Sequence, residues 1–182
     1  MPDQTLDFKS GFQPTLRPVL GARKAFASNM ITLSALQEGT IIHVLAEPSA
    51  PAVEDRLRAM GKGNVRTVSP RQWFMVSDER LSHGELKALL DALEPPAMGV
   101  DQSQGRVRIR IEGKMVERVL AKGTAVDLSL PAFPVGSSVT TLIGHITAHL
   151  TRLEESAFEI IVLRGFAESL WDDLVRMSAE FA

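Results

Sequence analysis

The stretch that decides the fold is residues 115–182, MVERVLAKGTAVDLSLPAFPVGSSVTTLIGHITAHLTRLEESAFEIIVLRGFAESLWDDLVRMSAEFA. It begins with a short amphipathic segment, which is followed by a loop rich in Gly and Pro. Residues 137–153 favour two strands, or one bent strand, with a break near Gly144. The last helix has one broad and mostly apolar face, formed by Phe166, Ala167, Leu170, Trp171, Leu174, Val175, Ser178 and Phe181. The stretch therefore predicts a sheet covered by a helix.

The earlier half of the chain repeats this order of elements. GTIIHVLAEP (39–48) and VEDRLRAMGKG (53–63) correspond to GRVRIRIEG (105–113) and MVERVLAKG (115–123). Likewise, residues 65–93 correspond to residues 150–178. We therefore predict an α+β fold with two pseudo-repeated β-α-β-β-α units, in which antiparallel sheets carry their helices on one face.

Local signals divide the chain into three segments. Residues 1–30 contain scattered Pro and Gly without a period, which predicts an extended arm. The arm either frays or wraps a partner, and its candidate anchors are Phe12, Leu16, Val19 and Leu20. Ser82 and Glu85 form a capping box that opens a helix, and Pro95-Pro96 ends it. The predicted segments are an arm (1–30), a first α+β half (31–96) and a second half (97–182), with the halves fused into one compact unit.

Composition excludes several classes of protein. The chain has 182 residues with 20 basic and 22 acidic side chains, a net charge of −2 that argues against a nucleic-acid partner. It has no Cys, so neither a disulfide nor a thiolate metal site can form. Neither a secretory signal nor an apolar run long enough to span a membrane is visible. We expect a cytoplasmic protein without a membrane partner.

Three arginines give the sharpest electrostatic feature. Arg106, Arg108 and Arg110 alternate with apolar residues, which predicts a half-buried strand with one wet face. Its arginine face is either solvated and paired with nearby Glu, or a patch for anions or an acidic partner surface.

The loop at 123–136 supplies two further candidates for partner contact. Asp127 is either a turn-forming residue or a site residue, and Phe133 lies in the same Gly/Pro-rich segment. His145 and His149 are spaced as HxxxH, but on the strand predicted here they would lie about 13 Å apart, too far to share a metal. No recognised catalytic motif is present. The residues therefore nominate no catalytic, cofactor-binding or metal-binding group and favour a binding or structural module.

A set of short motifs resembles a known family. They are LAKG at 120–123, Asp127-Leu128, FPVG at 133–136, Thr140-Thr141, Phe158 and RGFAESLW at 164–171. With these motifs the C-terminal third resembles the gamma subunit of heterotetrameric sarcosine oxidase. In the first half, Val65, Ser69-Pro70 and residues 73–76 resemble part of the aminomethyltransferase-type folate-binding fold. The resemblance extends over roughly residues 31–180.

The resemblance implies a role in a complex that oxidises sarcosine to glycine. Such complexes pass the one-carbon unit to tetrahydrofolate and convert oxygen to hydrogen peroxide. The implied partners are alpha, beta and delta subunits, which carry FAD, FMN, NAD, zinc and the folate site. This chain would be a non-catalytic subunit with a folate-binding-domain-like fold. The alternatives are a stand-alone folate-binding or one-carbon-transfer protein that seats glutamate carboxylates on the three arginines, and a homodimeric interaction module.

Overall fold

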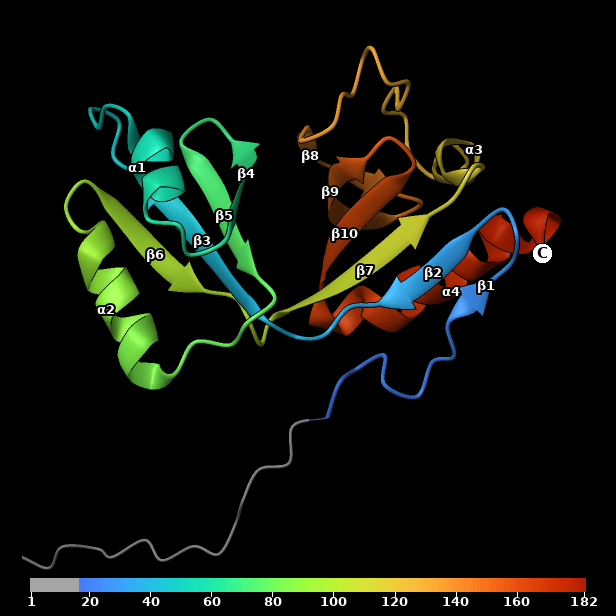
Figure 1. Ribbon diagram of the computed structural model, residues 1–182, viewed down its shortest axis with the longest axis horizontal. Coiled ribbons are helices and arrows are strands. Elements are labelled where there is room, and N and C mark those ends of the chain that lie inside the picture. Colours follow the sequence, from blue (N-terminus) through green and yellow to red (C-terminus); the bar gives the residue numbers. More distant parts are fainter. Residues whose placement is uncertain (1–16) are drawn as a thin grey trace, which may run out of the picture.

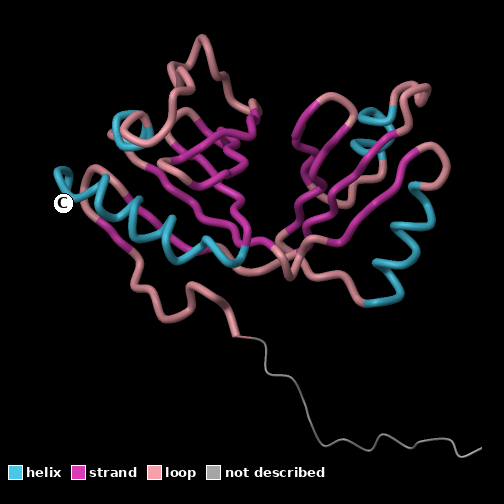
Figure 2. Tube along the Cα trace, turned by 180° about the vertical axis from the view of Figure 1, so that it is seen from behind, coloured by secondary structure: helices cyan, strands magenta, loops and turns pink. Residues whose placement is uncertain are grey.

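The computed structural model describes residues 17–182, which form two antiparallel sheets side by side with their helices on the outer sides (Figures 1 and 2). The four-stranded sheet contains β3 (Thr40–Ala46), β4 (Asn64–Ser69), β5 (Gln72–Ser77) and β6 (Ala97–Asp101), with helices α1 (Val53–Ala59) and α2 (His83–Leu93). The six-stranded sheet contains β1 (Phe26–Ala27), β2 (Thr32–Ala35), β7 (Arg106–Glu112), β8 (Ser138–Ile143), β9 (Ile146–Glu154) and β10 (Ala157–Leu163), with helices α3 (Val116–Leu120) and α4 (Ala167–Ser178). The predicted α+β class is confirmed.

The first sheet has the strand order β4-β5-β3-β6. Its central strand β5 is covered on both faces: Trp73 and Met75 contribute to the core under α1 and α2, and Phe74 and Val76 pack on the opposite face. Helix α2 begins at the predicted capping box, in which Ser82 accepts a hydrogen bond from the Glu85 backbone N–H. The helix therefore starts where the sequence predicts.

The second sheet has the order β1-β2-β7-β10-β9-β8, and its core is the larger of the two. Buried Leu170, Trp171 and Leu174 of α4 pack on this core, as the apolar face of that helix predicts. The tight turn between β8 and β9 contains Gly144 at φ 59°, a backbone conformation that glycine adopts without strain.

The repeat predicted from the sequence agrees with the order of the elements. The equivalent elements are β3 and β7, α1 and α3, β4 and β9, β5 and β10, and α2 and α4. The edge strands do not follow the expected chain boundary after Pro96. Strand β6, which follows Pro96, completes the first sheet beside β3, and β2, which precedes the first unit, completes the second sheet beside β7. The units therefore exchange edge strands.

The described part of the expected N-terminal arm packs on its own chain. Leu20 is buried in the core of the second unit, with Val19 packed against it. Phe26 and Ala27 form β1 and pair with β2. Phe12 and Leu16, the other expected anchors, lie outside the described residues. Residues 17–27 are therefore the outer edge of the second unit rather than a free arm.

Candidate functional site

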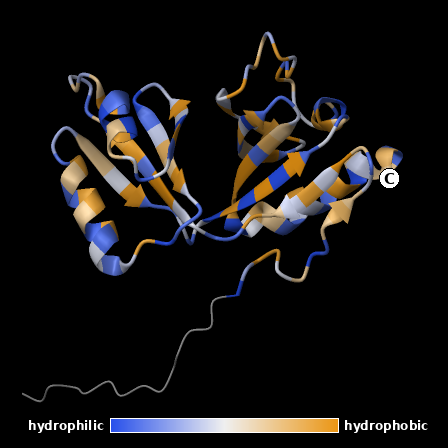
Figure 3. Cartoon of the chain, viewed as in Figure 1, coloured by the Kyte–Doolittle hydropathy of each residue, from blue (hydrophilic) through white to orange (hydrophobic). Residues whose placement is uncertain are grey.

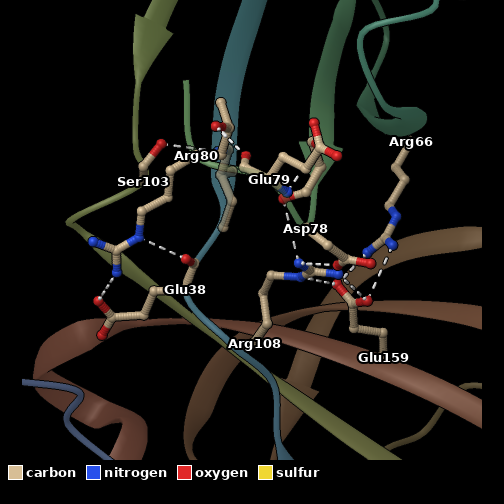
Figure 4. Close-up of polar contacts among 11 residues, drawn as sticks. Glu38, Arg66, Asp78, Glu79, Arg80, Ser103, Arg108 and Glu159 are labelled. Carbon is tan, nitrogen blue, oxygen red and sulfur yellow. Dashed lines mark hydrogen bonds and ion pairs between the residues drawn. The ribbon is translucent and has the colours of Figure 1, made fainter. Parts of the chain in front are cut away.

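A buried carboxylate joins the facing surfaces of the two sheets (Figure 4). Glu159 of β10 is 1% exposed and lies between Arg66 of β4 and Arg108 of β7. The Arg66 guanidinium donates to both Glu159 oxygens at 2.6 and 3.2 Å, and Arg108 does so at 2.9 and 3.0 Å. Arg108 also lies 2.6 Å from a carboxylate oxygen of Asp78. Ile161 packs beside this cluster on Ile41, Phe74 and Val76 of the first unit.

The two arginines of this cluster neutralise its two carboxylates. Burial alone would raise the pKa of Glu159, but hydrogen bonds from Arg108 and Arg66 outweigh it and lower the pKa to about 2. A buried ion pair that loses one member leaves an uncompensated charge. Glu159 is thus an ionised structural group that fastens one unit to the other.

A second carboxylate makes a similar connection nearer the surface. Glu38, in the link between β2 and β3, is buried and lies 3.1 Å from Arg80 and 2.9 Å from Arg164. Arg80 also donates to the Glu38 backbone carbonyl at 2.8 Å. Arg80 precedes α2, and Arg164 begins the 3-10 helix that leads into α4. Glu38 therefore ties together the starts of the two equivalent helices.

The three arginines singled out from the sequence have different surroundings. Arg110 lies 2.7 Å from Glu112 and 2.8 Å from Glu154, as the solvated reading predicts. The prediction of a wet face is wrong for Arg108, because the first sheet covers it. Arg106 lies over the Phe74 ring at 4.7 Å and has no carboxylate partner within residues 17–182. Burial lowers the pKa of Arg106.

Two histidines contact the same aromatic ring from opposite sheets. His149 of β9 is 2% exposed, and its ring lies edge-on to Phe74 at 5.2 Å. Its Nδ1 is 3.2 Å from the Thr140 hydroxyl. Burial lowers the pKa of His149 to about 4, helped by the charges of nearby arginines, so the ring is neutral at pH 7. His43 of β3 has its ring 5.0 Å from that of Phe74, and its Nε2 lies 3.1 Å from the Gln72 side-chain oxygen.

His145 and His149 do not form a pair of metal ligands. His149 lies in β9, as predicted, whereas His145 is exposed in the turn before that strand. Within the described chain, no three His, Cys, Asp or Glu side chains converge as a metal site would require.

The loop between α3 and β8 projects from the second unit and carries hydrophobic positions on its outer side (Figures 1 and 3). Asp127 is exposed, and its carboxylate accepts a hydrogen bond from the Ser129 N–H at 2.9 Å, which is the turn-forming arrangement. Phe133 is buried and stacks on Phe158 at 6.3 Å. Between residues 130 and 135 of this loop, the exposed apolar residues are Leu130, Pro131, Ala132, Pro134 and Val135.

Arg152 anchors this loop and was missed by sequence reasoning. The side chain is 0% exposed, lies over the Phe158 ring at 4.4 Å and pairs with Glu117 at 2.8 Å. It also donates to the backbone carbonyl of Leu128, at the base of the loop. A lone charge within the β-prone run at 137–153 was the available signal, because a buried charge needs a partner.

No helix in the described part of the chain is both long and apolar enough to cross a membrane.

Comparison with known proteins identifies one family and two similar folds. The model of the sarcosine oxidase gamma subunit family matches residues 38–180. A chain of the heterotetrameric sarcosine oxidase from Corynebacterium sp. U-96, in complex with pyrrole 2-carboxylate, is similar with a TM-score of 0.78 and 22% identity, covering 91% of this chain and 96% of that chain. A C-terminal regulatory domain of aspartate kinase from Porphyromonas gingivalis W83 gives a TM-score of 0.50 and 12% identity, covering 82% and 98%. At these identities the two structures show the fold alone. None of the curated proteins matches the chain.

Proposed function

Because the chain belongs to the sarcosine oxidase gamma subunit family, we propose that it is a non-catalytic subunit with an assembly role in a heterotetrameric sarcosine oxidase. The observation that carries the proposal is the extent of the family match, which runs through both units, the projecting loop and α4. The arrangement of charges supports it, since Glu159, Arg66 and Arg108 are occupied with one another.

The proposed partners are the alpha, beta and delta subunits of the oxidase. In this proposal they carry FAD, FMN, NAD, zinc and the tetrahydrofolate site, and together they convert sarcosine to glycine. This chain contributes contact surface to the complex rather than a reacting group. Its cytoplasmic location stays a prediction.

Three of the residues nominated from the sequence support a docking surface, although Phe133, which is buried, does not itself contact a partner. Asp127 shapes the base of the projecting loop, and Phe133 anchors it in the core, so that the loop's exposed apolar residues face outwards. Arg106 is the nominated arginine without a carboxylate partner in the described range, which leaves its charge for a partner. We propose these as supports of a docking surface, whereas Arg108 and Arg110 serve internal ion pairs.

Co-expression with the other oxidase subunits tests the proposed function. A tag on this chain should recover the flavin-containing subunits in stoichiometric amounts, and the eluate should be yellow. Complexes prepared without this chain should lose yield or thermal stability. A chain that stays alone at micromolar concentration beside its co-expressed partners would refute the proposal.

A stand-alone folate-binding protein remains the second candidate, favoured by Arg106, which has no carboxylate partner among residues 17–182. Titration of the isolated chain with tetrahydrofolate should then give a binding isotherm that Arg106→Gln weakens. The absence of heat and of a thermal shift would remove this candidate. Light scattering of the same sample tests the third hypothesis, that the chain forms a homodimer.

A further inference from the structure

The strand β6 forms an edge of the four-stranded sheet and, within residues 17–182, has a neighbouring strand on one side only. Its pairing with β3 is flanked by two backbone hydrogen bonds: Glu47 N–H donates to the Pro96 carbonyl, and Gln102 N–H donates to the Ile41 carbonyl. Hydrogen-bonded pairs alternate along an antiparallel ladder. These two bonds therefore determine which residues of β6 direct their backbone groups towards β3.

By this alternation, Met98 and Val100 direct their backbone N–H and C=O groups at β3. Ala97, Gly99 and Asp101 direct theirs to the outer edge. Gly99 is only half-buried although its inner face lies against α2, so the edge itself is open. A sheet edge with unpaired N–H and C=O groups is a template for a further strand.

In the second unit, the strand equivalent to β6 is paired on its outer side with a further strand. There, β2 occupies the place beside β7 that β6 occupies beside β3. The outer side of β2 is itself covered by an extended segment, β1, through the pairs of Phe26 with Leu33 and Ala27 with Thr32. The edge of one unit is thus capped by a strand, and the same edge of the other is bare in the described chain.

Side chains around β6 are apolar on the side away from the helices. Met98 is 54% exposed and Val100 is 39% exposed. Both lie on the open face, where they are paired across the ladder with Leu45 and His43. Figure 3 shows hydrophobic colouring along most of β6. A groove of about 490 Å³ adjoins the start of the strand and is lined by Leu45, Ala46, Glu47, Glu94, Pro95, Pro96, Ala97 and Met98.

The negative charges at this groove indicate that its occupant carries a positive charge. Glu47 and Glu94 line it, and neither carboxylate has a basic partner within residues 17–182. A lysine or arginine of the occupant would complement them. A second copy of this chain fits poorly, because antiparallel pairing of two β6 strands about Gly99 would place Asp101 of one copy opposite Ala97 of the other, on the side of the acidic Glu94.

We propose that β6 accepts an extended segment of another oxidase subunit as a fifth strand of the sheet. Apolar side chains of that segment cover Met98 and Val100, and a lysine or arginine lies beside Glu47 and Glu94. Main-chain hydrogen bonds provide the attachment, as in other cases of strand addition. This inference rests on the proposed function, because it takes its partner from the oxidase complex.

Hydrogen exchange resolved at single residues tests the alternation directly. In the free chain the amides of Gly99 and Asp101 should exchange fast, and those of Met98 and Val100 slowly. In the complex Gly99 and Asp101 should be protected at least tenfold. Protection that is unchanged on assembly would overturn the inference. Protection that rises with the concentration of the isolated chain would assign the edge to a second copy and also overturn it.

Substitutions separate this inference from the proposed function. Met98→Lys with Val100→Lys should weaken recovery of the partner subunits at least tenfold, and Glu47→Lys with Glu94→Lys several-fold. The controls are Leu142→Lys, which alters a residue 53% exposed on the edge strand β8, and Asp55→Lys on the exposed side of α1. Circular dichroism of each variant checks folding. If wild type assembles and the β6 variants assemble equally well, the inference fails alone; if wild type does not assemble, the proposed function fails.

Discussion

The two units share an order of elements but differ in how their sheets are completed. The first sheet ends at β6, a strand that follows the expected boundary at Pro96 and whose outer edge pairs with no strand of the described chain. The second sheet is completed by β2, which lies far earlier in the sequence and is covered in turn by β1. The order of strands and helices within each unit is therefore encoded by local sequence. The edge strand that completes each sheet, in contrast, comes from a segment outside the unit.

Separating the halves should have the largest effect. A fragment of residues 97–182 lacks β2, and so leaves β7 as an unpaired edge over the apolar core around Leu33. It also carries β6 without its partner β3. We expect no cooperative thermal transition for this fragment by calorimetry.

The matched control is a fragment of residues 17–182, which keeps every described strand and should unfold cooperatively. A cooperative transition in the 97–182 fragment would contradict this prediction, because the second unit would then fold without β2.

Removing the charge that joins the sheets should have the next largest effect. Glu159→Gln leaves Arg66 and Arg108 buried without their shared carboxylate, and loss of one member of such a pair typically costs about 3–5 kcal/mol. Urea denaturation at pH 7 measures the free energy of unfolding. Glu168→Gln, on the exposed side of α4, should change it by less than about 0.5 kcal/mol. Equal effects of the two changes would mean that the cluster does not fasten the units.

His149, which is buried against Phe74, should make the protein less stable in acid. His149 has its pKa lowered to about 4, so between pH 6.5 and pH 4 the unfolded chain binds a proton that the folded chain does not. Stability is therefore lost as the pH falls through this window, by roughly 3 kcal/mol for this group. The groups that face it are Phe74, Thr140, His43, Arg66, Arg106 and Glu159.

His149→Phe should remove that part of the pH dependence, measured as the free energy of unfolding in urea at pH 4.5, 5.5 and 6.5. The control His145→Gln, in the exposed turn, should change the free energy of unfolding at pH 6.5 by less than about 0.5 kcal/mol. A His149→Phe profile parallel to that of the wild type would contradict the assignment.

The smallest expected effect distinguishes the equivalent helices α2 and α4. Helix α2 begins with a capping box at Ser82, whereas α4 begins at Phe166 with no side-chain cap and depends on its buried face. Ser82→Ala should cost about 1 kcal/mol. Ser169→Ala, in the first turn of α4, should change the free energy of unfolding by less than about 0.5 kcal/mol by urea denaturation. If both substitutions lowered the free energy of unfolding by the same amount, the capping box would not distinguish the two helices.

Much of the element order was predictable because it depends on local patterns. The period of two in residues 106–111 specifies a strand, and the capping box at Ser82 specifies a helix start. The break at Gly144 specifies a turn. None of these signals depends on a distant part of the chain. The repeat followed from aligning these local signals, and the structure contains the same correspondence of strands and helices.

The junction between the sheets was not predictable in the same way. Alternation in residues 106–111 says that the strand's two faces differ, but it does not say what covers the polar face. Arg108 is buried because Glu159 and Arg66 meet it from distant segments. The single carboxylate within the apolar run 157–163 was a signal of such a partner, since a buried charge is costly unless it is paired.

The exchange of β2 also has a consequence for the chain as it is being made. Strand β2 is synthesised early, but its partner β7 ends at Glu112. At 5–20 residues per second, roughly 4–15 s pass between the two. During that interval Leu33, which is fully buried in the finished protein, has no sheet to join. The nascent chain therefore displays Leu33 on an unpaired strand for seconds, which gives a chaperone or an already folded partner time to reach it before the second unit closes.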